Sequence, residues 1–115
     1  MTLSVAIQMD PIEHIDIKSD STFMLALEAE ARGYSNYHYL AENLTFKNGE
    51  VTALANELNV RYQEDNHFTF KDSGTIKLAN FDVVLMRQDP PFDMTYITAT
   101  HLLEKIHPKT LVVNN

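Results

Sequence analysis

The segment MRQDPPFD at residues 86–93 concentrates side chains that suit the binding of a small polar ligand. Arg87 presents a planar fork of donors that matches a carboxylate group. Asp89 can accept hydrogen bonds from an ammonium group. Pro90 and Pro91 stiffen the segment, which reduces the entropy that is lost when a ligand orders it. The residue types together suit a zwitterionic, peptide-like ligand.

A second polar segment, DPIEHIDIKSD at residues 10–20, offers Asp10 as a further acceptor for an ammonium group. Each polar segment follows a short apolar run, at residues 3–9 and 81–86, which is typical of a buried strand. Each also leads into a predicted helix N-terminus, where free N–H groups favour anions. Ligands of open α/β sheets bind outside the carboxyl ends of the strands, so the two segments are expected to share one site.

Each feature of this candidate site also has a structural interpretation. Arg87 and Asp89 can pair with each other at the surface, which contributes less than about 1 kcal/mol. Asp93 can serve only as the cap of the helix that follows it. The Pro90-Pro91 pair can simply force a turn. The residues alone leave both interpretations open.

Several kinds of chemistry have no support in the 115 residues. The sequence lacks the glycine-rich dinucleotide fingerprint and the P-loop, and it contains no cysteine nucleophile. No local metal-binding pair occurs among the five histidines, and we interpret His38 and His101 as structural. The serines lack the context of a nucleophile elbow. The histidines are His14, His38, His67, His101 and His107.

Composition and charge narrow the class of protein further. The formal net charge of −7, without any block of basic residues, argues against a nucleic-acid partner. No apolar run is long enough to span a membrane, and the first residues do not resemble a signal peptide. Together with the absence of cysteine, this predicts a cytoplasmic protein. The hydrophobic content of 44% supports one domain with a small core.

The flanking elements are expected to hold the two polar segments in place. Residues 21–32 predict a helix whose N-cap is Asp20 or Ser21 and whose C′ residue is Gly33. Residues 94–106 predict a second helix with a buried stripe at i, i+3, i+4 and i+7 spacing. The stripe consists of Ala99, Leu102, Leu103 and Ile106. Further strands are predicted at residues 36–40 and 110–113.

Residues 44–79 contain several short β-prone runs separated by turn residues, and they predict an antiparallel β insertion. Asn48-Gly49, between two β-prone flanks, predicts a hairpin because both turn positions tolerate positive φ. Residues 58–62 and 67–71 alternate apolar and polar side chains like half-buried strands, and residues 72–74 (Asp-Ser-Gly) predict a turn. The whole pattern predicts an α/β fold, with a mostly parallel sheet, flanking helices and this hairpin insertion.

Four stretches of the sequence resemble one family closely, the N-terminal domain of prokaryotic glutathione synthase. The specific combination is Asp-Pro-Ile with a downstream Lys-x-Asp-Ser-x-Phe, followed later by Arg-x-Asp-Pro-Pro-Phe-Asp. The resemblance spans essentially all 115 residues and is loosest in the insertion. The stretches are QMDPIEHIDIKSDSTF (8–23), LALEAEARGY (25–34), ANFDVVLMRQDPPFDMTYITATHLLE (79–104) and PKTLVVNN (108–115).

The resemblance implies a Rossmann-like, pre-ATP-grasp domain of an ATP-grasp ligase. Such an enzyme joins γ-glutamylcysteine to glycine through an acyl phosphate, with ATP and Mg²⁺, and makes glutathione. The domain is expected to help hold the peptide, while the downstream ATP-grasp part binds the nucleotide and the metal. The implied substrate-binding residues form two lips: Met9, Asp10 and Pro11 on the first, and Arg87, Asp89 and Pro90 on the second.

Further expectations concern the chain as a whole. We expect it to be one N-terminal domain excised from a longer enzyme, inactive alone and prone to form homo-oligomers through an uncovered sheet face. The competing hypotheses are a stand-alone interaction module and a receiver-like module. The receiver hypothesis is weakened because Arg87 occupies the place of the phospho-accepting aspartate.

Overall fold

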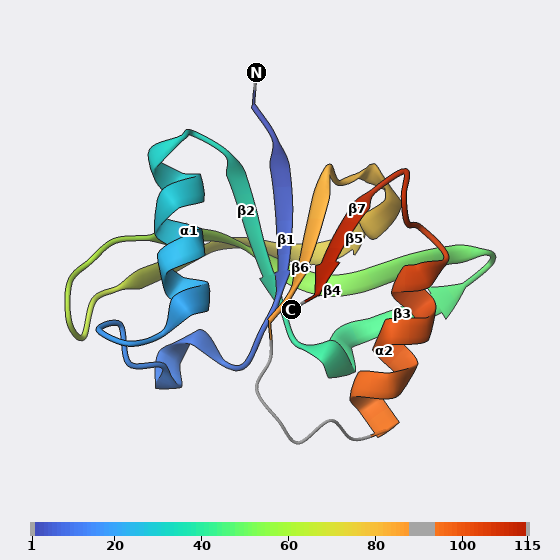
Figure 1. The fold of residues 1–115 in the computed structure, drawn as a ribbon, viewed down its shortest axis with the longest axis horizontal. Coiled ribbons are helices and arrows are strands. Elements are labelled where there is room, and N and C mark those ends of the chain that lie inside the picture. Colours follow the sequence, from blue (N-terminus) through green and yellow to red (C-terminus); the bar gives the residue numbers. More distant parts are fainter. Residues whose placement is uncertain (1, 88–93, 115) are drawn as a thin grey trace.

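A seven-stranded mixed sheet forms the centre of the computed structural model, in the order β3-β4-β2-β1-β6-β7 with β5 paired to β4 (Figure 1). The structure describes residues 2–87 and 94–114. Its strands are β1 (Ser4–Gln8), β2 (Ser35–Tyr39), β3 (Leu44–Lys47), β4 (Glu50–Val60), β5 (Phe68–Lys77), β6 (Val83–Met86) and β7 (Leu111–Asn114). Its α-helices are α1 (Ser21–Ala31) and α2 (Met94–Glu104), with short 3-10 helices η1 (Ile12–His14), η2 (Ala41–Asn43) and η3 (Leu78–Asn80). No helix in the described part of the chain is long and apolar enough to cross a membrane.

The strands β2, β1, β6 and β7 are parallel to one another and form the Rossmann-like half of the sheet. β1 lies between β2 and β6, and its last residue, Gln8, is in register with both Tyr39 and Met86. The carboxyl ends of these three strands therefore meet at one edge. The predicted α/β fold with a mostly parallel, helix-flanked sheet is confirmed.

The two helices cover opposite faces of this parallel half. β1 alternates between the faces, because Ala6 packs in the cluster that contains α2, whereas Val5 and Ile7 pack in the cluster that contains α1. Phe23 is the largest residue that α1 buries. The predicted stripe faces the other cluster: Ala99 and Leu103 of α2 are buried there, and Leu102 packs against them. The helix ends at Glu104 rather than at residue 106, and Ile106 is buried in the same cluster from the turn that follows.

The ends of α1 lie where the sequence predicts them. The Asp20 carboxylate accepts a hydrogen bond from the backbone N–H of Phe23 at 2.7 Å and caps the helix. Gly33 has a φ of 77° and donates its N–H to the Glu30 carbonyl at 3.0 Å, as a C′ glycine does. The Asp20 cap fixes where the first polar segment ends and α1 begins, and the Gly33 cap fixes where α1 ends.

The insertion confirms the predicted hairpin but corrects two predicted boundaries. Asn48 (φ 53°) and Gly49 (φ 78°) form the turn between β3 and β4. The turn predicted at residues 72–74 is wrong, because β5 continues through it and Gly74 pairs with Ala55. The separate strand predicted at residues 58–62 is also wrong, since β4 is one strand from Glu50 to Val60. The long β4 pairs with both ends of β5, from Phe68 to Phe70 and from Ser73 to Lys77. A shift of the pairing register between Asn56 and Leu58 separates the two paired stretches.

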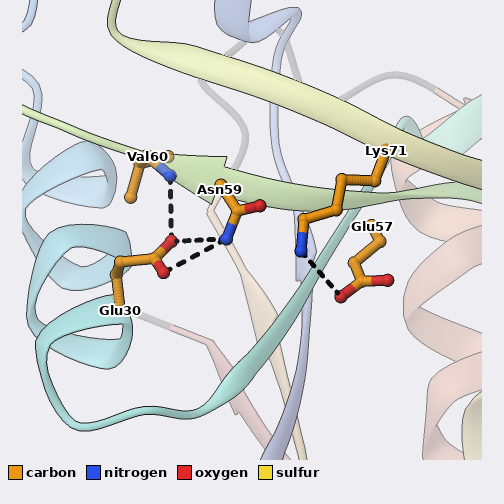
Figure 2. Close-up of polar contacts among 5 residues, drawn as sticks. All are labelled: Glu30, Glu57, Asn59, Val60 and Lys71. Atoms are coloured by element: carbon orange, nitrogen blue, oxygen red, sulfur yellow. Dashed lines mark hydrogen bonds and ion pairs between the residues drawn. The ribbon is translucent and has the colours of Figure 1, made fainter.

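A carboxylate on α1 ties the helix to the insertion, as Figure 2 shows. Glu30 accepts from the backbone N–H of Val60 at 3.0 Å and from the Asn59 amide at 3.1 and 3.2 Å. The nearby Lys71–Glu57 pair is longer, at 3.8 Å, and joins β5 to β4. The Glu30 contacts therefore couple α1, which borders the carboxyl edge, to the antiparallel half of the sheet.

Candidate binding site at the carboxyl edge of the sheet

Backbone hydrogen bonds align the first described residues of the two polar segments at the carboxyl edge. The N–H of Arg87, directly after β6, donates to the Gln8 carbonyl at the end of β1 at 2.7 Å. The N–H of Met9 donates to the Tyr39 carbonyl at the end of β2 at 3.3 Å. The first polar segment therefore leaves the sheet between the ends of β2 and β6, as expected from strands that run parallel.

The residues of the first lip differ in what they expose. Met9 is 2% exposed and packs in the core cluster of α1, so its side chain is a core residue rather than a ligand contact. Asp10 and Pro11 are half-buried. Ile12 is fully buried and begins η1. The lip therefore rests directly on the hydrophobic core.

On the second lip, the Arg87 side chain lies against the N-terminus of α1. Its Nη2 donates to the Ser21 hydroxyl at 2.8 Å, and its Nε donates to the Thr22 hydroxyl at 3.3 Å. A guanidinium group and a helix N-terminus both favour an anion, so their preferences act in the same direction here. Asp89, Pro90 and Asp93 lie outside the described residues, so this part of the predicted site has no structural outcome.

Four residues near this edge were not part of the predicted site. Ser21 and Thr22 contact Arg87. Two buried histidines contact the backbone of the first lip and of Ile12, the residue that follows it. His38 Nε2 lies 3.3 Å from the Asp10 carbonyl oxygen, and His67 Nε2 lies 2.7 Å from that of Ile12. No local pattern signals these histidine contacts, because each one joins residues from separate elements of the fold.

Burial lowers the pKa of one of these histidines, His38. The pKa of His38 is lowered from its usual value, mainly because burial disfavours the charged ring. The hydrogen bond to the Asp10 carbonyl and the negative charge of Glu13 oppose that effect in part. Burial also raises the pKa of Tyr39, at the end of β2, and keeps its phenol neutral.

A pocket of about 310 Å³ borders the first lip and the face of the insertion. It mixes polar and aromatic or aliphatic side chains, as small-molecule sites do. Its lining consists of Pro11, Glu13, His14, His38, Tyr39, Leu40, Asn43, Leu54, Asn56 and Phe70. Within residues 2–87 and 94–114, no group of three histidine or acidic residues could hold a metal ion.

The architecture and its edge define a Rossmann-like α/β domain, a class in which ligands bind at the carboxyl ends of the strands. A family model described as "Prokaryotic glutathione synthetase, N-terminal domain" matches residues 3–115. The chain belongs to this family, and the predicted family resemblance is confirmed.

Curated relatives support the same family across the whole chain. Glutathione synthetase of Rhodopseudomonas palustris is 54% identical over 115 residues, which are 100% of this chain and 37% of that protein. Glutathione synthetase of Agrobacterium fabrum is 50% identical over 112 residues, covering 97% of this chain and 35% of that protein. That of Escherichia coli O157:H7 is 43% identical over 113 residues, covering 97% and 36%. The chain thus spans little more than a third of the length of these relatives.

Proposed function

We propose that the chain is the peptide-binding N-terminal domain of a glutathione synthase. The full enzyme joins γ-glutamylcysteine to glycine with hydrolysis of ATP and makes glutathione. Family membership and the names of the relatives support this glutathione context. The role proposed for this chain is to hold the dipeptide at the carboxyl edge of its sheet.

The main support for a binding site here is the position of the Arg87 backbone beside the end of β1. Its N–H donates to the Gln8 carbonyl at 2.7 Å, which places its backbone beside the end of β1. Its guanidinium group lies at the N-terminus of α1, where it donates to the hydroxyls of Ser21 and Thr22. A dipeptide with carboxylates and one ammonium group needs cationic and anionic partners within a short span. In our proposal Arg87 binds a carboxylate of γ-glutamylcysteine, Asp10 accepts from its ammonium group, and Asp89 belongs to the same lip.

We assign ATP and Mg²⁺ to the ATP-grasp part of the enzyme, outside this chain. The glycines, at positions 33, 49 and 74, lie in turns or in β5, away from the helix N-termini where phosphates bind. The homo-oligomer, the inactivity of this piece alone and the cytoplasmic location remain predictions.

A ¹⁵N NMR titration of the chain with γ-glutamylcysteine, and with glutathione as a second ligand, tests the proposed function. We expect shifts that cluster at residues 9–11 and 86–93. Arg87→Ala should weaken binding about 10- to 100-fold, the effect of removing a hydrogen bond to a charged group. Arg32→Ala is the matched control, because Arg32 is an exposed arginine that pairs with Glu28 in the same helix, at 2.7 Å.

Two results contradict this proposal. Equal affinities for the Arg87→Ala variant and the original chain exclude Arg87 as the carboxylate contact. No shifts at millimolar ligand exclude a preformed peptide site on this chain, although membership of the family stands.

A further inference from the structure

Two buried histidines hold the backbone of the first lip on both sides of Pro11. His38 lies at the carboxyl end of β2, and its Nε2 is 3.3 Å from the carbonyl oxygen of Asp10. His67 precedes β5 in the insertion, and its Nε2 is 2.7 Å from the carbonyl oxygen of Ile12. The two ring contacts thus reach the carbonyls of residues 10 and 12 of one loop from two different parts of the fold.

The chemistry of these contacts fixes the direction of each hydrogen bond. A carbonyl oxygen can only accept, so each histidine donates through a protonated Nε2. His38 is 5% exposed and His67 is 7% exposed, so water does not readily replace either donor. Losing one donor would leave a loop carbonyl short of its partner in a buried setting.

Aromatic neighbours fix the orientation of both rings. The His67 ring meets the Phe23 ring of α1 edge to face, with centroids 5.6 Å apart, and the Phe68 ring at 4.9 Å. The His38 ring lies 5.4 Å from Phe70 of β5. The His67 ring contacts two aromatic rings and cannot rotate without displacing them, so its Nε2 stays directed at the Ile12 carbonyl.

The remaining histidines lack this arrangement. His14, His101 and His107 are exposed, and the His101 ring lies 4.0 Å from a carboxylate oxygen of the equally exposed Glu104. A buried, satisfied histidine is often only a piece of the core. Two of them that donate to carbonyls on either side of one proline form a specific support for that loop.

We propose that His67 and His38 are positioning residues, through which the β insertion and β2 hold residues 10–12 in the conformation that binds the peptide. This inference rests on the proposed function for its link to the ligand, whereas the support of the loop can be tested without any ligand. It also assigns a role to the antiparallel insertion, which supplies His67 from a region remote in sequence.

Hydrogen exchange of the isolated chain tests the support directly. The His14 amide donates to the Pro11 carbonyl at 3.1 Å and reports on η1, whereas the Ile7 amide reports on β1. In His67→Met, a similar volume without the donor, the His14 amide should exchange at least about tenfold faster relative to the Ile7 amide. His67→Gln retains a donor and should restore much of the protection.

The ¹³C shift of the carbonyl carbon gives a second, spectroscopic readout. The Ile12 carbonyl carbon should move upfield in His67→Met and return in His67→Gln. His38→Met should move the Asp10 carbonyl carbon in the same way, which keeps the test available if one variant does not fold. His101→Met is the control on an exposed histidine and should move neither signal.

The outcomes separate this inference from the proposed function. Equal acceleration of the His14 and Ile7 amides, or an unmoved Ile12 carbonyl, means that His67 is only a core residue and overturns the inference. A loosened loop in His67→Met supports it. Titration with γ-glutamylcysteine then tests the link, with about tenfold weaker binding expected in His67→Met. If the loop loosens in His67→Met but the original chain does not bind the dipeptide, His67 does support the loop and the proposed function is refuted.

Discussion

The two lips of the candidate site are anchored in different ways. On the first lip and at the residue that follows it, Met9 (2% exposed) and Ile12 (0% exposed) are part of the hydrophobic core. Two buried histidines contact the carbonyl oxygens of Asp10 and Ile12. On the second lip, the Arg87 side chain is held by the hydroxyls of Ser21 and Thr22 near the surface. The backbone of both lips joins the same strand, β1.

This difference separates the residues that shape the site from those free to contact a ligand. Changes at Met9 and Ile12 should act on folding first, because these two side chains are core residues. Changes at Arg87 should act on binding with little effect on folding, since exposed polar contacts contribute little to stability. The predictions below test this contrast, in order of decreasing expected effect.

The largest effect is expected for Ile12→Ala. The substitution removes a fully buried side chain from the cluster that also contains Ile7 and Phe23. It should lower the free energy of unfolding by about 2–5 kcal/mol, as measured by urea denaturation. Leu54→Ala is the control, because Leu54 is 57% exposed and should change stability by less than about 1 kcal/mol. A loss below about 1 kcal/mol in Ile12→Ala would mean that the first lip is not part of the core.

A smaller effect is expected for Glu30→Ala, which frees the far end of α1. The substitution removes the acceptor for the Asn59 amide and the Val60 N–H (Figure 2). We expect a loss of about 1–3 kcal/mol, because the Val60 backbone donor is left without its partner. Glu28→Ala is the matched control in the same helix, with an expected loss of about 0.5 kcal/mol from an exposed pair with Arg32. Equal losses in the two variants would show that Glu30 does not anchor α1.

The contrast between the lips also marks what the sequence could predict. Local rules located the Asp20 cap, the Gly33 C′ position and the Asn48-Gly49 turn, because each depends on residues close in sequence. The turn signal at residues 72–74 failed because pairing with β4 overrides local turn propensity.

In the candidate site, too, local features could be predicted from the sequence and long-range contacts could not. The shared edge of the two polar segments follows from parallel strands, and it was predictable. The contacts of His67 with Ile12 and of Arg87 with Ser21 were not, because they join residues 55 and 66 positions apart. These contacts arise only when α1 and the insertion pack against β1. No local pattern of residue types predicts that packing.

The pH dependence of stability should report on His38. Its folded-state pKa is lowered from 6.5 by burial, so below about pH 6.5 the unfolded state binds more protons than the native state. Stability should therefore be complete above that value and fall on acidification, by at most about 1.4 kcal/mol per pH unit from this group. His38→Gln should flatten this part of the curve, as measured by urea denaturation at a series of pH values. An unchanged slope would show that His38 protonates equally in both states.

The smallest effect on stability is expected for Ser21→Ala, on the second lip. Ser21 is the first residue of α1 but not its cap, since Asp20 holds that role. Alanine also favours helix, so the free energy of unfolding should change by less than about 0.5 kcal/mol. The Arg87 side chain nevertheless loses its 2.8 Å contact, and its guanidinium ¹⁵N resonances should shift and broaden. A loss above about 1 kcal/mol would place the second lip in the folding core as well, and the contrast between the two lips would fail.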